Sequence, residues 1–411
     1  MRALLRVSVT QSPIGEGTRR VMWLDHGAGM APAEIYFDLV GEHGVAPPVV
    51  LDGFLFGIVL YAMRLGADIH MRGAVSRAAL RNVHEFQAAW SLWRPARYGK
   101  ISVSADTVID TLPAPAGDKA IAAFSGGADS IFTALRHATG QLGDAGYPLN
   151  DSLLLVHGFD VPLDRPDHLE ALKTRVKPLA DRLGLQLRVI RTNLKSAELQ
   201  DWEDSFMPQL ACCLHNYAHA FRYGLAGSSE PYNALILPWG SNPVTDHLLS
   251  GAAFQLVHDG AGFSRTEKIA EIARDALATQ VLKVCWEGKE TFRNCGVCEK
   301  CLRTRLNFLA AGVENPACFD TPLSIGDIGT IRLRNTAQLA ELTSVLVYAK
   351  AANRRGGWVD ALERRIARGI DRPDAVQRLL LKSRNAWKLA RRGNWQEIAH
   401  KLKKQVARKA A

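Results

Sequence analysis

The chain has 411 residues, of which 47% are hydrophobic and 22% are charged, so a disordered chain is excluded and more than one domain is expected. Its net charge of +10 is unevenly spread. Residues 354–411 hold 17 Lys and Arg against 5 Asp and Glu, whereas the remainder holds 34 against 36. The start of the chain has no signal-peptide pattern, and the longest apolar run, residues 53–66, is too short for a bilayer. These features predict a cytoplasmic protein.

The first segment, residues 1–112, mixes strand-like runs with two helical ones. The strand-like runs are residues 19–27, 34–41, 67–73 and 100–108, and the helical ones are residues 53–66 and 76–93. The segment is followed by "TLPAPAGDKA", a stretch rich in Pro, Ala and Gly that is typical of a linker. Nothing in the segment indicates chemistry, so we predict an N-terminal accessory α+β domain.

The second segment, residues 113–325, alternates between strand and helix patterns. Strands are predicted at residues 119–124, 152–160, 185–193 and 233–242, and helices at residues 129–140, 166–184 and 207–227. This alternation predicts an α/β fold with a doubly wound parallel sheet. Ligands of such sheets bind outside the carboxyl ends of the strands. The third segment, residues 326–411, is predicted to be a helical, basic C-terminal region.

The run "SGGADS" lies between the first of these predicted strands and the helix that follows it. Gly126 and Gly127 allow backbone angles that a Cβ would block, so that main-chain N–H groups can converge on one point. Such a turn at a helix N-terminus binds phosphate through its N–H donors and the helix dipole. Ser125 and Ser130 add hydroxyl groups, and Asp129 is suited to hold Mg²⁺ or to brace the loop. The alternative is a strand-to-helix turn with a capping serine.

S-G-G-x-D-S after a strand resembles the pyrophosphate loop of the PP-loop ATP pyrophosphatase superfamily, whose fold is adenine nucleotide alpha hydrolase-like (HUP). The resemblance implies that Ser125, Gly126, Gly127, Asp129 and Ser130 hold the departing pyrophosphate of ATP. It also implies that the loop at His157 lies near the adenosine, and that Gly240 and Ser241 lie near the α-phosphate or the substrate. For His157 the alternative is a strand-end histidine with a structural hydrogen bond.

A second motif, residues 285–301, carries four cysteines. Two consecutive C-x-x-C steps bring three thiolates to one centre, and a fourth from an adjoining segment completes a tetrahedron. A closed four-thiolate set is typical of structural zinc. An iron–sulfur cluster is the alternative, but the downstream Cys-Pro of the ferredoxin pattern is missing. The predicted zinc ligands are Cys285, Cys295, Cys298 and Cys301.

Together the two motifs resemble the 7-cyano-7-deazaguanine synthase (QueC-type) enzymes within that superfamily, over residues 121–312. Those enzymes carry the phosphate loop near one end and, near the other, a basic helix start followed by the cysteine run. Here that helix start is "SRTEKIAEI", in which Arg265 and Lys268 are candidate phosphate contacts, with a solvated helix face as the alternative. The family's substrate-reading Asp is not in its usual setting, and Asp246 and His247 are the nearest candidates.

The resemblance implies an ATP-dependent ligase that uses ATP, Mg²⁺ and Zn²⁺. A carboxylate substrate is adenylated with release of pyrophosphate, and ammonia or an amine then attacks to give an amide or, after a second activation, a nitrile. Asp129 and Asp246 are the predicted catalytic residues. No glutaminase motif is visible, so ammonia is expected free or from a partner. The oligomeric state stays open, with a homodimer among the choices.

Two other functions remain at this point. An enzyme that thiolates tRNA would use the basic tail to hold RNA and would require a persulfide-carrying cysteine, for which Cys318 is the candidate. Alternatively, the tail anchors a nucleotide-binding protein to an anionic membrane or a partner. In the tail, Trp395, Ile398, Leu402 and Val406 share one face of a predicted helix. A solvated helix explains the tail equally well.

Overall fold

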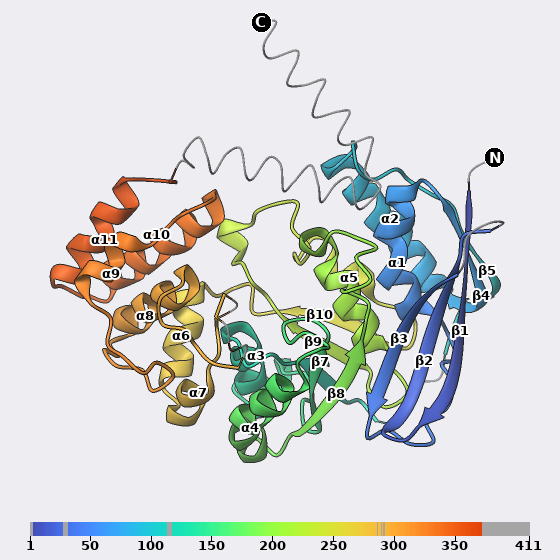
Figure 1. Ribbon diagram of the computed structural model, residues 1–411, viewed down its shortest axis with the longest axis horizontal. Coiled ribbons are helices and arrows are strands. Elements are labelled where there is room, and N and C mark those ends of the chain that lie inside the picture. The colour runs from blue at the N-terminus through green and yellow to red at the C-terminus, as the bar shows by residue number, and fades with distance from the viewer. Residues whose placement is uncertain are drawn as a thin grey trace, which may run out of the picture.

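The computed structural model describes residues 3–27, 32–112, 117–285, 287, 288, 290 and 292–371 (Figure 1). The strands are β1 (Leu4–Ile14), β2 (Gly17–Asp25), β3 (Ala33–Val40), β4 (Asp68–Ser76), β5 (Val103–Ile109), β6 (Ala120–Ala123), β7 (Ser152–His157), β8 (Gln186–Thr192), β9 (Tyr223–Gly227) and β10 (Gln255–Asp259). The helices are α1 (Asp52–Leu65), α2 (Arg77–Trp93), α3 (Ala128–Ala138), α4 (Pro166–Arg182), α5 (Trp202–His215), α6 (Arg265–Ala273), α7 (Ala276–Val281), α8 (Glu299–Ala311), α9 (Ile325–Thr330), α10 (Thr336–Ala351) and α11 (Gly357–Ala367). Short 3₁₀ turns are η1 (Gly143–Ala145), η2 (Tyr232–Ala234) and η3 (Asp246–Leu249).

All ten strands form one sheet in the order β10-β9-β6-β7-β8-β3-β2-β1-β4-β5. The strands from β10 to β8 are parallel, β8 to β1 are joined by antiparallel pairs, and β1, β4 and β5 are parallel again. The chain runs outward from β6 through β7 to β8 and then returns to β9 on the other side of β6. The strand order therefore reverses between β6 and β9, and this is the place where open α/β sheets bind ligands.

Both faces of the parallel strands are buried, which confirms the predicted α/β class with a mostly parallel sheet. Alternate residues of one strand belong to different hydrophobic cores: Leu153 and Leu155 of β7 face the core of α3 and α4, whereas Leu154 faces the core of α1 and α5. The alternation follows from the two-residue period of a strand. The near-continuous apolar run in β7 is what two covered faces require.

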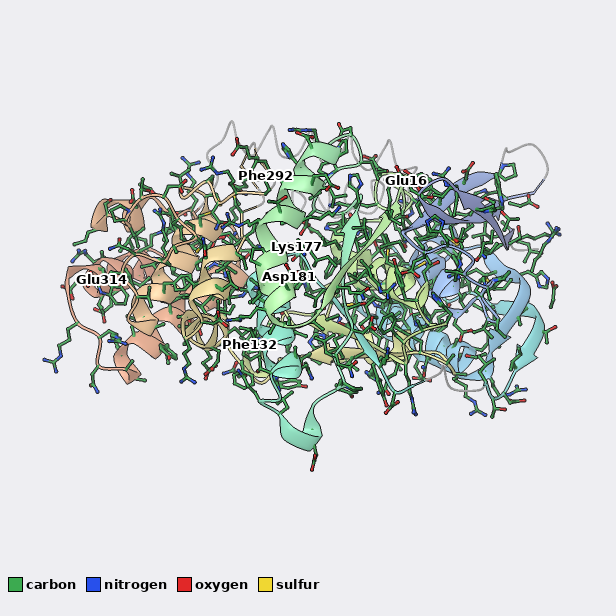
Figure 2. The ribbon with its side chains drawn as sticks, turned by 90° about the horizontal axis from the view of Figure 1, so that it is seen from below. Glu16, Phe132, Lys177, Asp181, Phe292 and Glu314 are labelled. Atoms are coloured by element: carbon green, nitrogen blue, oxygen red, sulfur yellow. The ribbon has the colours of Figure 1, made fainter. Side chains whose placement is uncertain are left out.

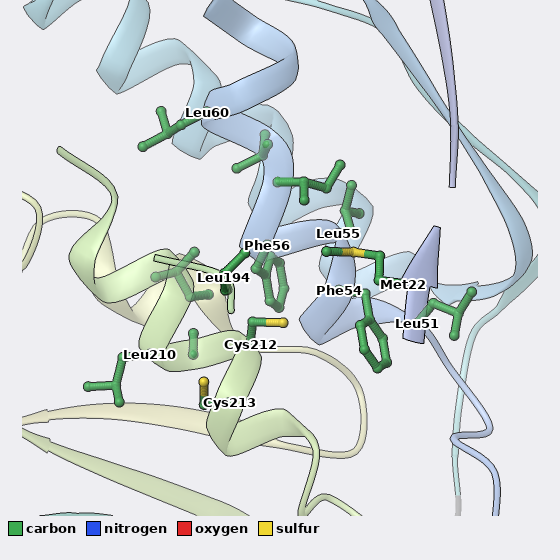
Figure 3. Close-up of a cluster of buried hydrophobic side chains, with 14 of the residues drawn as sticks. Met22, Leu51, Phe54, Leu55, Phe56, Leu60, Leu194, Leu210, Cys212 and Cys213 are labelled. Carbon is green, nitrogen blue, oxygen red and sulfur yellow. The ribbon is translucent and has the colours of Figure 1, made fainter. Parts of the chain in front are cut away.

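The N-terminal segment continues this sheet and shares a core with it. β3 pairs antiparallel with β8, with Phe37 opposite Thr192. Figure 3 shows α1 packed against α5, with Phe56 and Cys212 between the two helices. The Phe56 ring also lies 5.2 Å from the His215 ring, centroid to centroid. A Cβ on Gly57 would lie 3.0 Å from Cys212, so glycine permits the close approach of the two helices. The segments on the two sides of the predicted boundary at residue 112 therefore contribute strands to one continuous sheet.

Two predicted elements are wrong. The helix predicted over residues 207–227 ends at His215, and its last residues form β9. The small residues of β9 do not follow the usual strand pattern, so the sequence did not indicate a strand. They are small because of packing, since a Cβ on Gly224 would lie 2.6 Å from the Phe254 ring. The strand predicted over residues 233–242 is a loop that begins in η2. The other predicted strands and helices of residues 113–200 are confirmed as β6, α3, β7, α4 and β8.

The helices at the C-terminal end form a third core, seen at the left in Figure 1. Leu302 and Leu306 of α8 pack there with Leu342 and Val345 of α10. The predicted helical character is confirmed over α10 and α11, whereas the basic stretch at residues 395–408 lies outside the described residues. Among the residues that the structure describes, no helix is long and apolar enough to cross a membrane.

Candidate functional site

In the loop between β6 and α3, Gly126 has a backbone angle that requires glycine, as predicted, whereas Gly127 is extended with a φ of −81°. Gly126 has a φ of +72°, and a Cβ there would also lie 3.0 Å from Val176. The Ser130 hydroxyl donates to the Gly127 carbonyl at 3.1 Å and accepts from the Ser125 N–H at 3.3 Å. The N-cap residue of α3 is Gly127, which has no side chain, and its N–H donates to Ser125 Oγ at 3.4 Å. Among the described residues, no side chain accepts from the N–H groups of Ala128, Asp129 and Ser130. These groups are left for an external acceptor, and the helix dipole favours an anion there.

A cavity of about 290 Å³ opens at this loop, and we call it the strand-edge cavity. It lies at the carboxyl ends of β6, β7 and β9, where the strand order reverses. Its polar lining includes Ser125, Asp129, Ser130, Asp160, Glu203 and Lys300. Its apolar lining includes Phe159, Leu172, Trp202, Phe206, Met207 and Trp239. The lysine and the hydroxyl groups suit a polyanion, and the aromatic side chains suit a flat apolar group.

Two cations of α6 hold the carboxylate of Asp129. The Arg265 Nη2 lies 3.1 Å and the Lys268 Nζ 3.2 Å from its two oxygens, and Lys268 also donates to the Ser228 carbonyl. Arg265 and Lys268 keep only 15% and 1% of their side-chain surface exposed, so the alternative of a solvated helix face is wrong. Burial lowers the pKa of Lys268. A Ser264–Glu267 capping box fixes the start of α6 beside the loop.

Lys300 and Arg303 of α8 add two further positive charges that sequence analysis missed. Lys300 lines the strand-edge cavity, and burial together with the charge of Arg265 lowers its pKa. Among the described residues, no carboxylate forms an ion pair with the Lys300 ammonium. Arg303 is almost fully buried and pairs with Glu299 at 2.7 Å. The position of Lys300 between Cys298 and Cys301 places it in a conspicuous motif of the sequence. The motif was interpreted only as a metal site, so the lysine was not considered as a binding residue.

The four predicted zinc ligands meet at one point. The Sγ atoms of Cys285, Cys295, Cys298 and Cys301 all lie within 4.8 Å of one another. Cys285 and Cys298 are 3.9 Å apart, as are Cys295 and Cys301. A tetrahedral ion with bonds of about 2.3 Å to sulfur requires sulfur separations of about 3.8 Å, so the cluster is able to hold a zinc ion.

Hydrogen bonds surround the sulfurs of the cluster. The N–H groups of Gly288 and Cys298 donate to the sulfurs of Cys285 and Cys295 at 3.2 and 3.3 Å. A hydrogen bond from Cys301 lowers the pKa of Cys298 to about 5, and the same bond raises the pKa of Cys301. All four sulfurs are used and no open position remains, which is typical of a structural site.

Cys318, the candidate persulfide carrier, is buried outside the cluster, and burial raises its pKa to about 12. A sulfur carrier reacts as a thiolate. This environment holds the thiol in its neutral form and disfavours the tRNA-thiolation alternative.

His157 lies at the end of β7 but does not line the strand-edge cavity. Its ring Nε2 is 3.0 Å from the Pro162 carbonyl, and burial lowers its pKa, so the ring is neutral. This is the environment of the structural strand-end alternative. His157 is therefore not placed to contact an adenosine bound in the strand-edge cavity.

Asp246, Gly240 and Ser241 lie behind the cavity wall. The carboxylate of Asp246 is 1% exposed and accepts from Ser241 Oγ at 2.9 Å and from His258 Nδ1 at 2.7 Å. Burial raises its pKa. The Gly240 N–H donates to the Glu203 carbonyl at 2.8 Å. These residues stabilise the loop that carries Trp239. They do not line the strand-edge cavity, in which Asp246 was expected to act.

In comparisons with protein-family models, with curated proteins and with solved structures, nothing matches this chain. The case for a function therefore depends on the geometry of the site.

Proposed function

We propose that this chain is an ATP-dependent ligase of the PP-loop type, with the adenine nucleotide alpha hydrolase-like fold, that adenylates a carboxylate for attack by ammonia or an amine. The observation that carries the proposal is the N-terminus of α3 in the strand-edge cavity, where glycine is the N-cap, with the S-G-G-x-D-S loop around it and Lys300 in the same lining. A triphosphate needs N–H donors and buried positive charge, and both are present there. The aromatic side chains of the lining suit the adenine base or an acceptor.

The proposed reaction has two steps. A carboxylate oxygen of the acceptor attacks the α-phosphorus of ATP, and pyrophosphate leaves. Ammonia then attacks the acyl carbon of the adenylate, which gives the amide, AMP and a proton. Ser125, Ser130 and the first amides of α3 bind the pyrophosphate, and Lys300 offsets the charge that builds up on it.

The site also bears on where Mg²⁺ is held. Both oxygens of Asp129 already accept from Arg265 and Lys268, whereas Asp160 is exposed and lines the cavity. Asp160 is thus the better carboxylate for a Mg²⁺ ion that arrives with ATP, and Asp129 braces the cations. The ion would neutralise phosphate charge.

Zinc fits a different role. The cysteine cluster flanks Lys300 on both sides, since Cys298 precedes it by two residues and Cys301 follows it. A bound Zn²⁺ would fix the first turn of α8 and with it the direction of Lys300. The metal is proposed to support the site without taking part in the chemistry.

Pyrophosphate release from MgATP, measured with ammonium and a panel of carboxylic acids, tests the proposal. We expect release that depends on the acceptor, with AMP as the nucleotide product. In Asp129→Asn the ion pairs with Arg265 and Lys268 are weakened, and release falls on the order of 10²-fold. Asp181→Asn is the matched control, because Asp181 lies on the outer face of α4 (Figure 2). Absence of Mg-nucleotide binding in calorimetry, or ADP and phosphate as products, would refute the proposal.

A further inference from the structure

A second cavity, of about 310 Å³, lies near the C-terminal end of α5. The strand-edge cavity uses residues of the first half of α5, between Trp202 and Leu210, whereas the second cavity uses His215 and the residues that follow it. We call it the Arg20 cavity. Most of its wall is apolar and includes Ala46, Pro47, Pro48, Val50, Phe54 and Phe254. Its volume is at the lower end of the range for small-molecule sites, about 300–1,000 Å³.

One wall of this cavity carries a buried guanidinium that has only neutral acceptors. Arg20 is 2% exposed. Its Nε donates to Gln11 Oε1 at 2.8 Å and its Nη2 to the Ala46 carbonyl at 3.1 Å. Its Nη1 donates to the carbonyl and to the Oδ1 of Asn216, at 2.7 and 3.2 Å. These bonds use four of the five N–H groups of the side chain. Within the described chain no carboxylate pairs with Arg20.

The other ionisable groups of the cavity leave this charge unbalanced. The carboxylate of Asp52 accepts from the N–H and the hydroxyl of Ser76, at 2.7 and 2.6 Å. His215 bonds the Leu249 carbonyl through Nε2, and burial lowers its pKa to about 4, so the ring is neutral at pH 7. Burial also lowers the pKa of His219, the third of these groups. A buried, unpaired charge is costly, and burial lowers the pKa of Arg20 to about 10.

We infer that the Arg20 cavity binds a small molecule with one carboxylate group and an apolar body. The carboxylate would accept from the free Nη2 N–H of Arg20, and the body would pack against the Pro, Val and Phe side chains. A rival role is that Arg20 caps α5 through the Asn216 carbonyl. A helix C-terminus carries only about half a unit of negative charge, so capping leaves part of the Arg20 charge unbalanced. The inference does not depend on the proposed function, because the two cavities share no lining residue.

The test uses hexanoate as the probe and hexanamide as its uncharged match, with binding to the full chain measured by calorimetry. We expect hexanoate to bind at least tenfold more tightly than hexanamide. Ala218→Leu fills the cavity and leaves Arg20 unchanged, so it should abolish hexanoate binding without unfolding the protein. Arg20→Gln should remove the preference for the anion.

Lys300→Gln locates the binding, because Lys300 lines only the strand-edge cavity. Hexanoate affinity should not change in this variant. Equal affinities for hexanoate and hexanamide would overturn the inference and leave Arg20 as a helix cap. Hexanoate binding that survives Ala218→Leu, or that is lost in Lys300→Gln, would also overturn it.

Discussion

The two halves of the ten-stranded sheet differ in where their loops meet. In the parallel half, from β10 to β8, all strands end at the same edge, so the loops after β6, β7 and β9 converge on the strand-edge cavity. In the other half, the antiparallel strands β1, β2 and β3 end at alternate edges, so their turns point away from one another, and only β1, β4 and β5 are parallel. The comparison indicates why the candidate chemistry lies in one half, although one hydrophobic core spans both halves.

The N-terminal half nevertheless holds part of the site in place. Asp204, in the first turn of α5, is 1% exposed and accepts from Arg97 at 2.6 Å and from Tyr98 at 2.8 Å. Arg94 pairs with its other oxygen at 2.9 Å. The neighbouring residues Trp202 and Glu203 line the strand-edge cavity. The N-terminal half therefore supports the start of α5, and none of its described residues lines the cavity.

Removal of the metal should have the largest effect and should fall on the parallel half. Cys298→Ser deletes one of four ligands, and structural zinc contributes about 10–16 kcal/mol in zinc-finger peptides. We expect loss of bound metal, measured by elemental analysis, and faster hydrogen exchange in α8 and α6, with β1, β2 and β3 protected as before. Cys318→Ser is the control and should keep the metal. A Cys298→Ser protein that retains full metal content would contradict the assignment of this ligand.

A core substitution tests whether the two halves unfold as one unit. Phe56→Ala removes a buried ring between α1 and α5 and should lower the free energy of unfolding by about 3–5 kcal/mol. Because the core spans both halves, urea denaturation should show a single shifted transition. The exposed Leu92, at 79%, supplies the control Leu92→Ala, with a change below about 0.5 kcal/mol. Two separate transitions, of which only one shifts, would show that the halves are independent domains.

The sequence was informative where a residue's role is local. The alternation of strand and helix patterns, the double glycine with its serines, and the spacing of Cys295, Cys298 and Cys301 each depend on neighbours in the chain, and the structure has β6, α3 and the cysteine cluster at the predicted places. Cys212 and Cys213, which lie within the helix predicted over residues 207–227, are core residues of α5 with 0% exposure.

What the sequence could not predict depends on long-range packing. Pairing between β3 and β8 joins residues 149 to 155 positions apart, and no local pattern indicates it. β9 has small residues because Phe254 and Asp129 pack closely against it, and the sequence gives no indication of these contacts. Asp246 was predicted to be catalytic from its position in the sequence, but its carboxylate is buried against His258 of β10. The place of Lys300 in the cavity also depends on the fold, because tertiary packing brings α8 to the loop between β6 and α3.

Lys300 provides a test that affects chemistry without affecting stability. Lys300→Gln removes a positive charge from the strand-edge cavity, and we expect pyrophosphate release to fall by about 10²–10³-fold. Metal content and the circular dichroism spectrum should not change. Lys177→Gln is the matched control, because Lys177 is exposed and pairs with Asp181 on the outer face of α4 (Figure 2). Equal activities of the two variants would remove Lys300 from the proposed site.

The junction between the halves should also be sensitive to acid, through His215. Its ring packs between Phe56 and Phe254, and burial lowers its pKa from 6.5 to about 4. The unfolded chain therefore binds a proton below pH 6.5 that the folded chain does not bind until about pH 4. The stability that depends on neutral His215 is complete above pH 6.5 and is lost as the pH falls toward 4.

Between pH 7.5 and pH 5, this difference in pKa lowers the free energy of unfolding by about 2 kcal/mol. Urea denaturation at several pH values measures the loss. His215→Gln should flatten this part of the pH profile, since glutamine does not titrate, even if the variant is less stable at every pH. The control His84→Gln alters a ring that is 77% exposed and should keep the parent slope. An unchanged slope in His215→Gln would mean that the acid sensitivity arises away from the contact between α1 and α5.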